Sequence, residues 1–69
     1  MVEYKAKNGT KVTFIDGTLT CIRKGLVMTF PNVQMQVLSD IRFIAKNGVY
    51  VILPVIKYGE IESFNIVEV

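Results

Sequence analysis

The sequence predicts an all-β fold: a small antiparallel meander that forms a curved sheet, a half-barrel or a barrel of six to eight short strands, with at most one short helix. Three observations lead to this prediction. No stretch repeats apolar residues at helical spacing over three turns. Short runs rich in β-branched and aromatic residues instead alternate or are wholly apolar. These runs end at Gly, Pro, Asn or Asp residues, as strands do.

The first three expected strands are residues 2–7, 11–15 and 18–23. Asn8-Gly9 and Asp16-Gly17 separate them, and both pairs are typical of type I′ hairpin turns. On the side expected to be buried lie the residues at every second position, which are Val2, Tyr4 and Ala6, then Val12 and Phe14, then Leu19 and Cys21.

The middle of the chain predicts strands at residues 26–30 and 33–38. Lys24-Gly25 precedes the first of these strands, and Pro31-Asn32 divides the two. Leu26, Met28 and Phe30 share one face of the first strand. A short helix over residues 37–45 is the alternative, because several apolar positions there also fit one helical face.

Three further strands are expected at residues 41–46, 49–53 and 61–67. Asn47-Gly48 is the turn before the second of them. Residues 49–53 are apolar at every position, which indicates a central strand covered on both faces, and Pro54 is expected to end it. In the last strand Phe64 and Ile66 share one face, while Ile61 is expected on the other.

Length and composition indicate one domain, residues 1–69, that associates with further chains. A domain this short buries only about 60% of the surface of its unfolded chain. Hydrophobic residues make up 51% of this one, with a mean hydropathy of +0.40. A single cysteine permits no internal disulfide. Oligomerisation is the remaining way to stabilise so small a core, so we expect a homo-oligomer, a dimer or larger.

Few residues could perform chemistry. There is no histidine, and one cysteine cannot build a multi-thiolate metal site. Asp16 is explained by its turn, and Cys21 by its place beside Leu19 on an apolar strand face. Neither phosphate-binding glycine motif occurs. We therefore expect no enzyme, no catalytic residue, no cofactor and no metal site.

The net charge of +2 does not define a partner. Residues 1–25 hold five basic and two acidic side chains, a balance of +3, whereas residues 58–69 hold three acidic side chains and no base. These opposite signs could pair within the fold or between subunits. No signal peptide is visible, and no apolar run approaches the roughly 18 residues of a membrane span. We therefore expect a cytoplasmic protein that has no membrane span.

Two surfaces are candidates for binding. The interface candidates, chosen as apolar residues on expected outer strands, are Leu26, Met28, Phe30, Ile61, Phe64 and Ile66. A basic and aromatic contact patch is the second candidate, formed by Arg23, Lys24, Arg42, Lys46 and Tyr58. Positive grooves with exposed aromatics bind single-stranded nucleic acid, which makes a small nucleic-acid-binding barrel an alternative function.

The segment 8–25, "NGTKVTFIDGTLTCIRKG", resembles the opening of bacterial pleckstrin-homology-like domains. Residues 40–44, "DIRFI", are similar to a later segment of the same family. The resemblance covers about half of the chain and implies binding of proteins or lipids, without catalysis. The C-terminal helix that closes the barrel in that family is missing from the pattern here, so the resemblance also implies that a partner chain covers the open end.

These observations together favour a non-enzymatic interaction module that self-associates and binds another protein. Such a chain would resemble the accessory or inhibitor proteins of phages and mobile elements. A structural subunit that assembles edge to edge is a further alternative.

Overall fold

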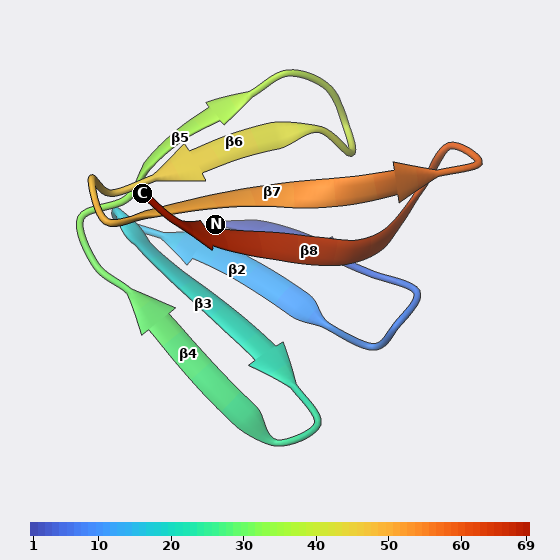
Figure 1. Ribbon diagram of the computed structural model, residues 1–69, viewed down its shortest axis with the longest axis horizontal. Helices are drawn as coiled ribbons and strands as arrows, with labels where there is room; N and C mark the ends of the chain where they lie inside the picture. Colours follow the sequence, from blue (N-terminus) through green and yellow to red (C-terminus); the bar gives the residue numbers. More distant parts are fainter.

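The computed structural model describes residues 1–69 and contains eight strands and no helix (Figure 1). The predicted all-β antiparallel class is therefore confirmed. None of the elements is a helix long and apolar enough to span a bilayer. The strands are β1 (Val2–Lys5), β2 (Lys11–Ile15), β3 (Thr18–Arg23), β4 (Leu26–Phe30), β5 (Gln34–Val37), β6 (Phe43–Lys46), β7 (Tyr50–Lys57) and β8 (Glu60–Glu68).

The strands form two antiparallel sheets in the orders β1-β2-β3-β4 and β5-β6-β7-β8. The sheets meet where β1 ends and β8 begins. There the backbone N–H of Lys7 donates to the carbonyl of Ile61 at 2.9 Å, and that of Asn8 donates to Glu62 at 3.2 Å. The side chains of Lys7 and Glu60 add an ion pair, so the opposite charges of the two chain ends do pair within the fold. The edge strands are β1 and β4 in one sheet and β5 and β8 in the other, and the sheets do not close.

The core lies between the sheets and draws on both. The ring of Phe43 in β6 stacks on that of Tyr4 in β1, with 4.5 Å between centroids. Period-two alternation explains the inward residues of β2 and β3, as predicted. The buried apolar residues are Tyr4, Val12, Leu19, Cys21, Phe30, Val33, Phe43, Ala45, Ile52 and Ile61.

Type I′ geometry occurs at three hairpin turns. Both central residues have positive φ at Asp16-Gly17 (47° and 80°), Lys24-Gly25 (47° and 82°) and Tyr58-Gly59 (53° and 74°). The prediction for Asp16-Gly17 is confirmed.

The type I′ prediction is wrong for Asn8-Gly9, because only the glycine has positive φ. The N–H of Gly9 donates to the carbonyl of Ala6, and Ala6 in turn donates to Thr10, which is the pattern of a three-residue loop with a glycine bulge. The Asn8 side-chain oxygen accepts the N–H of Thr10 at 3.0 Å. The asparagine thus acts through its side chain and not through a left-handed backbone.

The short helix over residues 37–45, which the sequence left as the alternative, does not form, and a loop joins β5 to β6 instead. The hydroxyl of Ser39 accepts the N–H groups of Ile41 and Arg42. A serine that satisfies backbone donors in this way competes with helix formation.

Strand β7 is longer than the strand predicted at residues 49–53, and it is less buried than predicted. It continues through Pro54 to Lys57. The ladder with β6 ends at Ile52, so at Pro54 the strand pairs only with β8 and the missing N–H leaves no gap in a second ladder. Ile52 is buried, whereas Val51 and Leu53 are half-buried, so the strand is covered fully on one face only.

A bulge in β8 corrects the predicted facing of its side chains. Val55 pairs with Ser63 and Ile56 pairs with Ile61, which leaves Glu62 as an extra residue. An extra residue shifts the alternation by one position. Ile61 therefore faces the core together with Phe64 and Ile66, and not away from them.

Alkaline pH is expected to destabilise the fold through Tyr4. Burial raises the pKa of the Tyr4 phenol above its ordinary value of 10.0, and the charge of Asp40 adds a smaller rise. The folded state holds this proton more tightly than the unfolded state, so its stabilisation is complete below pH 10 and is lost as pH rises through the folded pKa. Thermal melts between about pH 8 and pH 11 should show the loss. Tyr4→Phe should show a shallower decline, and an unchanged slope would contradict this assignment.

Candidate functional site

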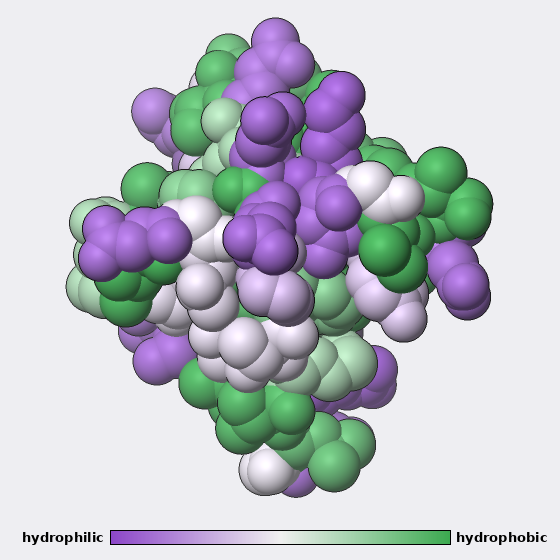
Figure 2. Space-filling view, turned by 90° about the vertical axis from the view of Figure 1, so that its left-hand side faces the viewer, coloured by the Kyte–Doolittle hydropathy of each residue, from purple (hydrophilic) through white to green (hydrophobic).

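Strand β4 is exposed at four of its five residues. Leu26, Val27 and Met28 are 72%, 61% and 46% exposed, so both faces of the strand are open to solvent. Figure 1 shows the β3–β4 hairpin extending away from the body of the molecule. Apolar surface gathers at this end of the molecule in Figure 2. Neighbouring exposed apolar side chains of this kind indicate a contact surface.

The free edge of β4 presents the backbone groups of Val27 and Thr29. The type I′ turn at Lys24-Gly25 makes Arg23 and Leu26 a hydrogen-bonded pair. Hydrogen-bonded and non-bonded pairs alternate along an antiparallel ladder. The N–H and C=O groups of Leu26, Met28 and Phe30 therefore point to β3, and those of Val27 and Thr29 point outward, where no other strand pairs with them.

Nothing in β4 protects this edge. Natural edge strands carry lysine, proline or a bulge that discourages pairing with another chain. The five residues of β4 contain no charge and no proline, and their ladder with β3 is regular. The first proline, Pro31, comes only after the strand has ended.

An apolar groove of about 480 Å³ lies beside the end of β4. One wall comes from β4 and the connection after it, and the other comes from the β6–β7 hairpin. At its base the rings of Phe30 and Tyr50 meet edge to face, with 5.3 Å between centroids. The groove is lined by Met28, Thr29, Phe30, Pro31, Asn47, Val49 and Tyr50.

Asn47 holds the two walls of the groove together. Its side-chain oxygen accepts the N–H groups of Val49 at 2.9 Å and Tyr50 at 2.8 Å. Its amide group donates to the carbonyl of Pro31 at 3.2 Å. The N–H of Asn47 donates to the carbonyl of Tyr50, so Gly48 and Val49 are the central residues of this turn. Of the two only Gly48 has positive φ, at 88°, which is the φ pattern of type II′. The asparagine is thus a structural clamp on the groove.

The structure divides the six predicted interface residues. Leu26 and Met28 lie exposed on β4, where they were expected. Phe30 and Ile61 are each 6% exposed and belong to the core, so they offer little surface to a partner. Phe64 and Ile66 are half-buried against that core. The bulge at Glu62 accounts for the inward position of the β8 group.

The five residues of the predicted basic and aromatic patch are not brought together. Arg23 and Lys24 lie at the β3–β4 turn, at one extreme of the molecule, whereas Tyr58 is in the β7–β8 turn (Figure 1). Arg42 precedes β6 and Lys46 ends it, so these two lie at opposite ends of one strand. Tyr58 is 98% exposed. No continuous positive groove follows from this arrangement.

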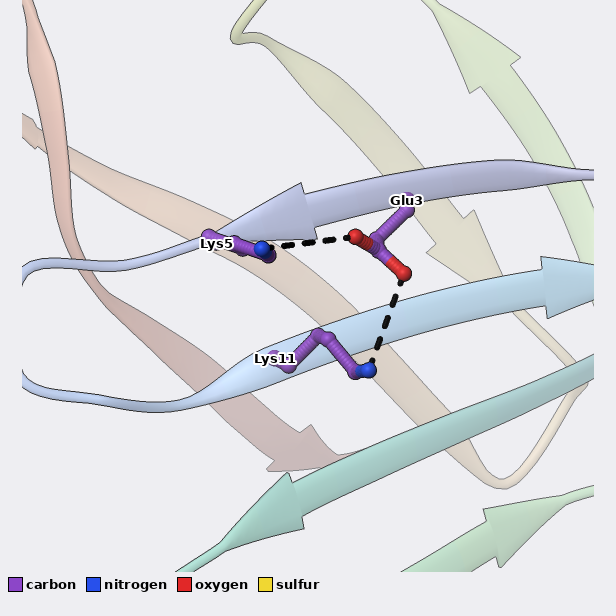
Figure 3. A network of polar contacts seen from close by, with 3 residues as sticks. All are labelled: Glu3, Lys5 and Lys11. Carbon is purple, nitrogen blue, oxygen red and sulfur yellow. Dashed lines mark ion pairs between the residues drawn. The ribbon is translucent and has the colours of Figure 1, made fainter.

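Other lysines are engaged with carboxylates. Glu3 lies between Lys5 on its own strand and Lys11 on β2, with N–O distances of 3.9 and 3.7 Å (Figure 3). Lys57 pairs with Glu62 at 3.1 Å. Exposed pairs of this kind contribute little to stability, but they neutralise the charge that an anionic ligand would need.

The surroundings of Cys21 and Asp16 fit a structural role for each and not a reactive one. Cys21 is 3% exposed, and burial raises the pKa of its thiol, with an opposing smaller effect of Arg23. A protonated, buried thiol is a poor nucleophile. Asp16 occupies a left-handed turn position. No three His, Cys, Asp or Glu side chains gather as a metal site would require.

Sequence reasoning missed Val27 and Thr29 because only one face of the strand was considered. A signal was present, since residues 26–30 contain no charge on either face. It also missed Val49 and Tyr50, which reach the groove from a segment 20 residues away from β4 and carry no local signal of that contact.

The chain was compared with protein-family models, with curated proteins and with solved structures, and none of them matches.

Proposed function

We propose that this protein is a non-enzymatic interaction module that self-associates and binds another protein through the free edge of β4. The observation that carries the proposal is a strand with apolar side chains exposed on both faces, unpaired backbone groups and no protecting charge. A cytoplasmic accessory or inhibitor protein of a phage or mobile element would act in this way. The resemblance to pleckstrin-homology-like domains supports the same class.

Strand addition explains how such an edge would bind. An extended segment of a partner pairs with the exposed N–H and C=O groups, which supplies affinity, while side-chain hollows beside the edge supply selectivity. Val27 and Thr29 provide the backbone groups, and the groove that Phe30 and Tyr50 line provides an apolar hollow beside β4. Both elements of the recognition mode thus lie next to each other.

Removal of one edge donor is expected to abolish self-association. Val27→Pro deletes an outward N–H and leaves the ladder with β3 unbroken, because proline is tolerated where the N–H faces solvent. Sedimentation velocity over about 1 µM to 1 mM protein should show a concentration-dependent dimer or larger species for the native chain and a monomer for the variant. The association should persist or strengthen with added salt, since apolar contact holds it.

Val27→Thr is the matched control, because it keeps both the β-branched shape and the N–H group and should still associate. Val27→Lys tests the edge independently of proline, since a lysine on an edge strand discourages pairing. Thermal melts establish that each variant is folded. A folded Val27→Pro protein that associates as strongly as the native chain would refute the role of the edge.

A further inference from the structure

We infer that β4 pairs with β4 of a second copy of this chain, antiparallel, about a twofold axis that passes beside Met28. This inference rests on the proposed self-association and specifies its surface and register. A twofold contact uses the same patch on both copies, so the patch must complement itself. Three properties of β4 meet this requirement.

The first property is its pattern of free backbone groups. Centred on Met28, antiparallel self-pairing places Val27 of each copy opposite Thr29 of the other. Val27 and Thr29 are the two residues whose N–H and C=O groups point outward. This register therefore forms four hydrogen bonds between the copies and leaves none of these edge groups unpaired. The two Met28 residues then face each other as a non-hydrogen-bonded pair, the type in which side chains lie closest.

The second property is the match between an exposed side chain and the groove. Leu26, Met28 and Phe30 share one face of β4. In this register Leu26 of one copy lies opposite Phe30 of the other, and Phe30 lines the apolar groove. Leu26 is the most exposed large apolar residue of the strand. Each copy thus brings the most exposed large apolar side chain of its β4 to the groove of the other.

The third property is the absence of repulsion within the strand. A twofold axis places like residues near one another, so a charge on β4 would face its own copy across the axis; none is present. Pairing of β4 with β5 of a second copy would instead leave a free edge on each side and continue into an open array. It would also set the apolar strand against one that carries Gln34 and Gln36.

The size of the contact predicts a reversible dimer. A five-residue strand is about 17 Å long, and a contact of that length buries less than the roughly 1,000 Å² of a lasting interface. We therefore expect monomer and dimer to interconvert, and the fraction of dimer to rise with protein concentration.

Cysteine cross-linking tests the register. Cys21 must first be replaced by alanine, because it lies directly opposite Met28 on β3 and would compete for a thiol there. In the Cys21→Ala background, Met28→Cys places two thiols across the axis with Cα atoms about 4.5 Å apart, within the range of a disulfide. Val27→Cys is the matched control. In this register Val27 lies opposite Thr29 of the other copy, so the Cα atoms of the two residues 27 are about 8 Å apart, beyond the range of a disulfide.

Under mild oxidation the Met28→Cys protein should form a covalent dimer at least about tenfold faster than the Val27→Cys protein, a difference of about 1.4 kcal/mol in barrier. Position 27 is the more exposed of the two, so random collision would favour the control. Equal cross-linking of the two, or none in either, would overturn the inference. Multimers larger than a dimer in sedimentation of the Cys21→Ala protein would also overturn it, in favour of an open array.

The same sedimentation experiment separates this inference from the proposed function. Dimers without preferential cross-linking at position 28 would leave self-association standing and reject only the register. A monomer at every concentration would reject both self-association and the register.

Discussion

Replacement of Phe43 by alanine is expected to unfold most of the protein at room temperature. Phe43 is 1% exposed, and its ring contacts Tyr4 of the first sheet at 4.5 Å and Phe64 of its own sheet at 6.1 Å between centroids. Truncation of a buried phenylalanine lowers the free energy of unfolding by about 3–5 kcal/mol. A core of this size rarely supplies more than about 3–5 kcal/mol in total.

Denaturant and thermal melts followed by circular dichroism measure this effect. Ile15→Ala is the matched control, because Ile15 is a large apolar residue of β2 that is 48% exposed, and its loss should be within about 1 kcal/mol. Equal melting temperatures for the two variants would show that Phe43 is not the link between the sheets.

Gly17→Val is expected to lower the free energy of unfolding by about 1–2 kcal/mol. Gly17 has a φ of 80°, a region that β-branched residues avoid. A Cβ at this position would meet no atom within 4 Å, so the loss arises from backbone strain and not from a clash. Its carbonyl also accepts the N–H of Val33 at 2.8 Å, which ties this turn to the connection between the sheets.

For a domain of this length each 1 kcal/mol corresponds to about 4–8 °C in melting temperature, so calorimetry resolves the change. Gly17→Asn is the control, because asparagine tolerates positive φ and should lose much less. Amide exchange at Val33 should accelerate in the valine variant. An asparagine variant as unstable as the valine variant would contradict a strain mechanism.

Period-two alternation and turn residues predicted the strand class, a range of six to eight strands that includes the observed eight, and most inward residues, because these signals are local. Val12, Leu19 and Cys21 are buried as this pattern requires. The signals failed where a local rule was overridden. Pro54 continues a strand because one of its two ladders has already ended, and Glu62 shifts the phase of β8.

The binding edge was only partly predictable. Leu26 and Met28 follow from their apolar character and outer position, whereas Phe30 turns inward because the strand enters the body of the molecule at that end. Which strand becomes an edge depends on the order of the strands in each sheet, and no single segment encodes that order. The separation of Arg23, Arg42 and Tyr58 could not be predicted for the same reason. Whether residues of different turns form one patch depends on which turns lie together in the fold.

The strand order has a kinetic consequence. All six ladders join strands that are neighbours along the chain. Sequence-local pairings form with little loop-closure entropy, and chains dominated by them reach the native state faster than β proteins with distant pairings. Distant parts of the chain meet in the core, in the contact between Lys7–Asn8 and Ile61–Glu62, and in the hydrogen bonds of Val33 to Gly17 and of Asn47 to Pro31. We therefore expect each four-stranded sheet to form first as a series of hairpins, and the two sheets to pack against each other as the late step of folding.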